Sequence, residues 1–178
     1  MKKFTALLLF CMLLCASCKE HKEKNTAARE KISMPDHVEV YNPYMGKDLS
    51  DPLKSNASLK IYTLIDVSCS PCFLKLEKWD KLQAEIKAIK PVAIIPVCYS
   101  KDNFEMIRFL FESERIPKNH LPLVFDLDNK FRQQNATLVN PLGQLTALTD
   151  ENNNVLLTGD PLDDKADKDK FFKMIAAK

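Results

Sequence analysis

Two cysteines separated by two residues, Cys69 and Cys72, are the side chains of this sequence best suited to covalent chemistry. A thiolate attacks a disulfide sulfur, and a second thiol one helical turn away can then attack the mixed disulfide that forms. We therefore interpret Cys69 as the candidate nucleophile and Cys72 as the candidate resolving thiol. Pro71 between them suits the first turn of a helix, where its missing N–H is not needed.

Two elements are expected to position this pair. Residues 59–67 form an apolar run that predicts a buried strand, and residues 73–89 show the apolar spacing of an amphipathic helix. The first N–H groups of that helix would point at the leading sulfur and favour its thiolate. Trp79 falls on the apolar face of the helix, and we interpret it as a packed core residue.

The N-terminus has the three parts of an export signal. Two lysines begin it, residues 6–14 are apolar, and small residues precede Cys18. The apolar run is too short for a helix that spans a membrane. The segment resembles a bacterial lipobox, which implies that Cys18 is lipidated and becomes the first residue of the mature protein. We expect a lipoprotein signal peptide over residues 1–17.

Charge and cysteine use narrow the classes of partner. The whole chain has a formal net charge of +2, and removal of the two signal lysines leaves the remainder with none. No basic field is left for nucleic acid, so we expect no nucleic-acid partner.

An exported compartment permits disulfides, and Cys69 with Cys72 is the obvious pair. Cys98 lies in another apolar run, and we interpret it as a buried small hydrophobe.

The remaining chain predicts one domain with an N-terminal extension. Residues 18–54 are expected to be the lipid-anchored tether and extension, with a solvated stretch over 19–36 and a short edge strand over 37–41. The elements expected after the cysteine pair are strands 91–99 and 121–126, helix 102–116, short helix 129–134, hairpin strands 144–149 and 154–158, and helix 163–177. This alternation predicts an α/β fold with a mixed central sheet and helices on both faces.

The strand that leads into Cys69-Ser70-Pro71-Cys72, the following strand-helix-strand segment and the closing hairpin and helix resemble the thioredoxin superfamily over about residues 55–178. With the export signal, the chain is most similar to TlpA/ResA-like thioredoxin-like lipoproteins of Bacteroidetes-type bacteria. The resemblance implies a thioredoxin-like fold and thiol-disulfide exchange by Cys69 and Cys72 with no bound cofactor. It also implies a reductant of protein disulfides in the cell envelope, kept reduced by a membrane partner. The location implied is the periplasmic side of a membrane or the outer membrane, reached through the lipid anchor.

Three positions differ from the family's usual pattern. Ser68 stands where tryptophan is common, and Thr63 stands where a buried carboxylate often assists the resolving thiol. Gln144 aligns with the cis-proline beside the disulfide, whereas Pro141 comes three residues early. A cis bond before a residue other than proline costs roughly 2.5–4 kcal/mol. Substrate docking, which the resemblance assigns to Gln144 with Ser70 and Pro71, is therefore expected to be altered or supplied by another conformation.

Other functions remain open at this point. A metal site would need further ligands, but His37 and His120 are isolated and no second CxxC occurs, so we expect no metal. Copper-delivery modules of this fold would carry CxxxC with a downstream histidine, and peroxidases a Thr-x-x-Cys motif. The main alternative is a non-catalytic thioredoxin-like binding lipoprotein with a structural Cys69–Cys72 disulfide. An exposed and reactive Cys69 would distinguish the enzyme from it.

Overall fold

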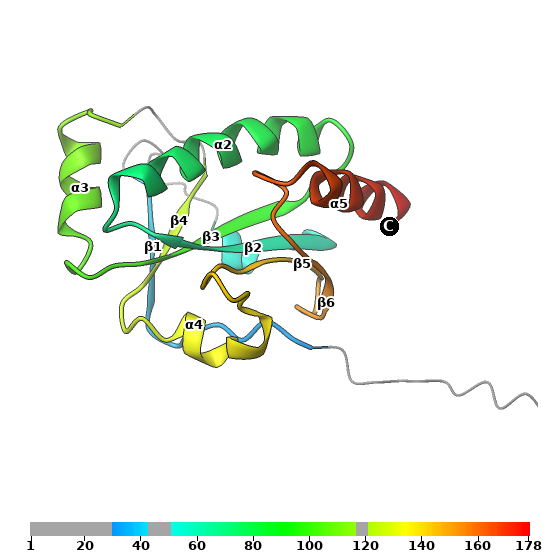
Figure 1. The fold of residues 1–178 in the computed structure, drawn as a ribbon, viewed down its shortest axis with the longest axis horizontal. Helices are drawn as coiled ribbons and strands as arrows, with labels where there is room; N and C mark the ends of the chain where they lie inside the picture. Colours follow the sequence, from blue (N-terminus) through cyan, green and yellow to red (C-terminus); the bar gives the residue numbers. More distant parts are fainter. Residues whose placement is uncertain (1–29, 43–50, 117–120) are drawn as a thin grey trace, which may run out of the picture.

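A computed structural model describes residues 30–42, 51–116 and 121–178 (Figure 1). Six strands form one mixed sheet in the order β1-β4-β3-β2-β5-β6. The strands are β1 (Val38–Tyr41), β2 (Leu59–Asp66), β3 (Ala93–Tyr99), β4 (Leu123–Asp126), β5 (Thr146–Asp150) and β6 (Val155–Thr158). The helices are α2 (Ser70–Lys87), α3 (Glu105–Glu112), α4 (Phe131–Gln134) and α5 (Lys165–Ala177), with 3-10 turns η2 (Pro52–Lys54) and η3 (Ala136–Leu138).

The strand that leads to the cysteine pair lies in the middle of the sheet. β2 pairs in parallel with β3, with Ile61 opposite Ile94, and antiparallel with β5, with Thr63 opposite Thr146. Its first seven residues are all buried. A strand covered on both faces reads as a continuous apolar run rather than an alternating one, which explains why the sequence predicted it well.

Helices cover both faces of the sheet, as predicted (Figure 1). On one face α2, α3 and α5 pack through the larger core, to which α2 contributes four buried residues: Leu76, Trp79, Leu82 and Ile86. On the other face a smaller core joins α4 to residues from β2, β3 and β5. The interpretation of Trp79 as a packed core residue is confirmed, because only 1% of it is exposed.

The N-terminal side of the domain differs from the prediction. Ile32 lies in the smaller core and is 2% exposed, and its N–H donates to the carbonyl of Asn153 at 3.0 Å. The Ser33 N–H donates to Asn135 Oδ1 at 2.9 Å, and Asn135 Nδ2 donates to the Ser33 carbonyl at 2.8 Å. The prediction of a solvated stretch over 19–36 is therefore wrong for residues 30–34. The folded part begins before residue 55, whereas the predicted signal, Cys18 and the rest of the tether lie outside the described residues.

The edge strand and the hairpin are confirmed, but the helix expected over 102–116 is shorter. β1 pairs antiparallel with β4 at the sheet edge, and β5 pairs with β6. Asp102 accepts from the Met106 N–H at 3.0 Å and so caps α3 from outside it. The helix ends at Glu112, and Glu114 has a left-handed backbone with φ of 54°. No helix in the described ranges is long and apolar enough to cross a membrane.

Candidate functional site

Cys69 occupies the position immediately before α2. Its backbone is extended, with φ of −131° and ψ of 122°, and its side chain makes no capping hydrogen bond to the helix. Ser70, Pro71 and Cys72 form the first turn, as expected for Pro71, although the apolar spacing indicated the helix only from residue 73. That turn contains no acidic residue. The positive end of the helix dipole is thus available to a thiolate at Cys69, which is a half-buried free thiol.

The segment between β2 and Cys69 is tied to the neighbouring strand. The Val67 N–H donates to the carbonyl of Tyr99 at 3.0 Å, and the Ser68 N–H donates to Asp66 Oδ1 at 2.9 Å. The hydroxyl oxygen of Ser68 accepts from the Lys101 N–H at 2.8 Å. Ser68, at the position where the family often has tryptophan, therefore connects the approach to Cys69 with the end of β3.

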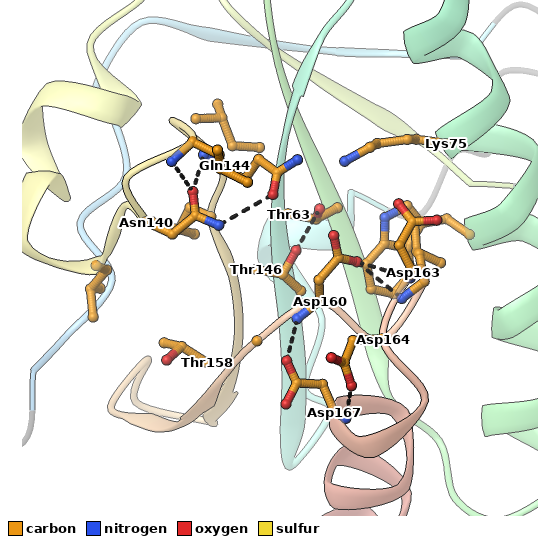
Figure 2. A pocket seen from close by; sticks show the side chains of 17 residues that line it. Thr63, Lys75, Asn140, Gln144, Thr146, Thr158, Asp160, Asp163, Asp164 and Asp167 are labelled. Atoms are coloured by element: carbon orange, nitrogen blue, oxygen red, sulfur yellow. Dashed lines mark hydrogen bonds between the residues drawn. The ribbon is translucent and has the colours of Figure 1, made fainter.

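Thr63 replaces the expected buried carboxylate with a hydroxyl. It lies on β2, is 4% exposed, and its Oγ1 is 3.1 Å from Oγ1 of Thr146 on β5. The two hydroxyls satisfy each other across the strand pair, as Figure 2 shows. A hydroxyl does not ionise near neutral pH, so Thr63 cannot act as the proton acceptor that a carboxylate would be.

Gln144 lies in a tight turn whose backbone is already hydrogen-bonded. Its N–H donates to Asn140 Oδ1 at 2.9 Å, and its carbonyl accepts from the Asn140 N–H at 2.8 Å. Its side-chain Oε1 accepts from Asn140 Nδ2 at 3.2 Å. Gly143 supplies the positive φ of 77° that the turn needs, and no peptide bond between described residues is cis. The docking role predicted for Gln144 would therefore have to come from its side-chain amide nitrogen.

A pocket of about 380 Å³ lies beside these elements (Figure 2). Thr63 and Leu64 of β2, Lys75 and Trp79 of α2, the turn with Gln144, and the connection from β6 to α5 surround it. Trp79 contributes a buried indole nitrogen that has no hydrogen-bond partner in the described structure. The pocket is lined by β2 and α2, the two elements that flank Cys69, although Cys69 itself is not part of the lining. Thr63 and Gln144 were singled out from sequence, whereas the other polar groups of the lining were not.

The fold can be compared with solved structures. A thioredoxin-related protein from Neisseria meningitidis superposes with a TM-score of 0.53 at 14% identity, covering 80% of this chain and 100% of that one. A putative thiol:disulfide interchange protein DsbE from Chlorobium tepidum gives 0.51 at 20% identity, covering 83% and 96%. This chain has the thioredoxin-like fold. A thioredoxin-like protein from Porphyromonas gingivalis also gives 0.51, at 14% identity, covering 69% and 78%.

These similarities show the thioredoxin-like fold alone, so the chemistry of the site has to be argued from the residues of this chain. No protein-family model matches the sequence, and no curated protein matches it. The placement of the cysteine pair at the junction of β2 and α2 agrees with the expectation from the resemblance.

Two other predicted positions lie away from the cysteine pair. Cys98 of β3 is fully buried, and burial raises the pKa of its thiol far above the ordinary value, so the interpretation as a buried hydrophobe is confirmed. His37 is exposed and its Nδ1 lies 3.4 Å from Asp128 Oδ1. The described ranges contain no cluster of three or more side chains that could hold a metal.

Sequence reasoning missed the polar lining of the pocket. Lys75, Asp160 and Asp164 line the pocket, and none of the three was singled out as a site residue from sequence. They converge only because the β6–α5 connection folds back toward α2 (Figure 2). No local pattern in the sequence could have brought these residues together.

Proposed function

We propose that this protein is an exported thiol-disulfide oxidoreductase that reduces disulfides of proteins in the cell envelope. The observation that carries the proposal is the position of Cys69 before α2, with the N-terminal turn of the helix free of acidic groups and of a side-chain cap. Helix N-termini in general favour the thiolate of a cysteine placed there, and the thiolate is the reactive form. Cys72, three residues on, supplies the second thiol.

The reaction would proceed in two exchanges. The Cys69 thiolate attacks one sulfur of the substrate disulfide, forms a mixed disulfide and releases the other substrate sulfur as a thiolate. Cys72 then attacks Sγ of Cys69, which forms the Cys69–Cys72 disulfide and releases the second substrate thiolate. The substrate gains two electrons and the cysteine pair loses two. A dithiol partner, which we propose to be a membrane reductant, returns the pair to the dithiol form.

The cellular setting rests on the N-terminal sequence. We propose that residues 1–17 are removed as a lipoprotein signal peptide and that Cys18 carries the lipid, which would hold the domain at the periplasmic face of a membrane or at the outer membrane. The expected partners are thiols and disulfides of envelope proteins. Mass spectrometry of the membrane fraction tests this, since a lipidated chain begins at Cys18 and a Cys18→Ala chain does not anchor.

The exchange mechanism can be tested with the full chain and two variants. Cys72→Ser should accumulate a mixed disulfide between Cys69 and a disulfide probe such as 5,5′-dithiobis(2-nitrobenzoate), whereas Cys69→Ser should not. At pH 7 Cys69 should react faster than a free cysteine in a short peptide, because the helix terminus favours its thiolate. A redox titration against glutathione gives the potential and hence the direction. Equal reactivity of Cys69 and the peptide thiol would refute the proposal.

A non-catalytic binding module with a structural Cys69–Cys72 disulfide is the second candidate. The turn around Gln144 favours it, because the backbone groups that would dock an extended substrate are bonded to Asn140 instead. Under this alternative the pair would stay oxidised through the whole glutathione titration. Under the oxidoreductase proposal it would change between dithiol and disulfide within the range of redox proteins, about −120 to −270 mV.

A further inference from the structure

One wall of the pocket beside α2 carries hydrogen-bond donors that lack acceptors. Lys75 is half-buried and forms no ion pair in the described part of the chain. The hydrogen bond from Lys78 and, after it, the positive charge of Lys75 hold the pKa of Asp163 below its ordinary value. Figure 2 shows its amino group pointing toward the side chain of Gln144, whose amide oxygen is occupied by Asn140 and whose amide nitrogen is not. Trp79 is 1% exposed, and its indole N–H has no partner in the described structure. A ligand with a negatively charged acceptor would satisfy the amino group of Lys75 and the amide nitrogen of Gln144.

The facing wall carries carboxylates that are only partly used. Asp160 Oδ1 accepts from the N–H groups of Leu162 and Asp163, at 3.1 and 3.3 Å. Asp164 Oδ1 accepts from the Asp167 N–H at 2.9 Å as the cap of α5. The Oδ2 atom of each of these two carboxylates has no partner in the described ranges. A ligand with a cationic donor would satisfy this second wall.

The remaining lining acids are already paired. Asp163 bonds to Lys78, and Asp167 Oδ1 accepts from Lys170 at 2.8 Å. Lys75, Asp160 and Asp164 are then the unpaired charges of the lining, one positive and two negative. A simple anion would meet a net negative lining, and a simple cation would leave the amino group of Lys75 without an acceptor. A group that carries both charges satisfies both walls.

We propose that this pocket binds the α-amino carboxylate end of a small disulfide, with cystine as the representative. This inference rests on the proposed function and adds a substrate class to it. The carboxylate lies against Lys75, Gln144 and Trp79, and the ammonium lies against Asp160 and Asp164. Cys69 immediately precedes α2, and Lys75 follows it by six residues, a rise of about 9 Å along the helix axis. In this proposal the bound half-cystine lies with its sulfur on the side of the pocket toward the N-terminus of α2, where Cys69 is.

The exchange with such a ligand balances as the proposed reaction does. The Cys69 thiolate attacks one sulfur of cystine, forms a disulfide with one cysteine and releases the other as its thiolate. Cys72 displaces the second cysteine and forms the Cys69–Cys72 disulfide. Two electrons pass from the pair to cystine, and an added dithiol such as dithiothreitol restores the pair.

Three disulfides with different charged groups test the proposal, each rate being divided by the rate of the same disulfide with glutathione, because the pKa of the leaving thiol also affects exchange. Cystine carries both groups, cystamine lacks the carboxylate, and 3,3′-dithiodipropionate lacks the ammonium. The full chain, reduced beforehand by dithiothreitol that is then removed, should react with cystine about tenfold faster than with either analogue, because each charge-assisted bond adds specificity. Equal rates with all three would overturn the pocket assignment while leaving the exchange reaction intact.

Matched variants then separate the two walls. Lys75→Met should slow the reaction with cystine and dithiodipropionate about tenfold and leave cystamine unchanged. Asp164→Asn keeps the cap of α5, because asparagine caps as well as aspartate, and should slow cystine and cystamine instead. Lys81→Met removes the same charge from α2 outside the lining and should change none of the rates. A uniform loss in either pocket variant would refute the assignment of the walls.

A binding measurement without exchange keeps this inference separate from the proposed function. Trp79 is the only tryptophan of the chain, so its fluorescence reports the pocket. S-methylcysteine is a zwitterion that has no disulfide, and it should shift this emission at saturation. Its analogues 2-(methylthio)ethylamine, which lacks the carboxylate, and 3-(methylthio)propionate, which lacks the ammonium, should not. Binding with an unreactive Cys69 would support the pocket and refute the oxidoreductase. Disulfide exchange without binding would do the reverse.

Discussion

Replacement of Ile32 by alanine should destabilise the whole domain. Ile32 is 2% exposed and packs in the smaller core on the α4 face. The change removes three carbon atoms, worth about 2.4 kcal/mol at roughly 0.8 kcal/mol each. The space left behind adds to this, and buried isoleucine-to-alanine changes cost about 2–5 kcal/mol. We expect a loss of about 3 kcal/mol in the free energy of unfolding.

Urea denaturation followed by Trp79 fluorescence measures this loss, because Trp79 lies on the opposite face of the sheet and reports global unfolding. In a thermal scan the same loss lowers Tm by about 6–12 °C for a chain of this size. Lys31→Ala is the matched control, since its side chain is exposed. A loss below about 0.5 kcal/mol for Ile32→Ala would show that residues 30–34 are not docked, and the solvated tether would then extend to them.

Two further predictions concern buried and capping groups. Cys98 should react with alkylating reagents only at the rate of global unfolding, since it is fully buried and burial raises the pKa of its thiol. Rapid labelling of Cys98 in the folded protein would contradict its placement in the core. The hydrogen bond from Ser100 holds the pKa of the Asp102 carboxyl below its ordinary value of 3.8. The contribution of this carboxylate to the free energy of unfolding is therefore present above about pH 4, and it is lost as the pH falls through the lower pKa of the folded state. Asp102→Asn should therefore lower stability at pH 7 and flatten the acid side of the stability curve, and an unchanged acid limb in urea titrations would refute this.

The elements that depend on local pattern were predicted closely from sequence. The apolar run of β2 and the helical spacing of α2 identified both elements that flank Cys69. A strand buried on both faces has a continuous run of apolar residues, and a helix buried on one face has apolar residues at helical spacing, so both can be recognised from the sequence. The β5–β6 hairpin followed from the polar break between two apolar stretches, and its pairing is confirmed. Helix ends were predicted less well: the helix expected over 102–116 is α3 (Glu105–Glu112), which begins later and ends earlier.

The sequence by itself determined the cysteine pair, its strand-to-helix junction and the fold class, because these follow from neighbouring residues and their periodicity. Only the tertiary structure decided that Ile32 is buried, since it packs in a core built from β2, β3, α4 and β5, and its N–H bonds to the carbonyl of Asn153. The same holds for the pocket, where Lys75 and Asp160 line the same cavity as Gln144 although neither stands out in its own segment. Convergence of polar groups from distant elements depends on chain reversal and packing, which no local pattern encodes.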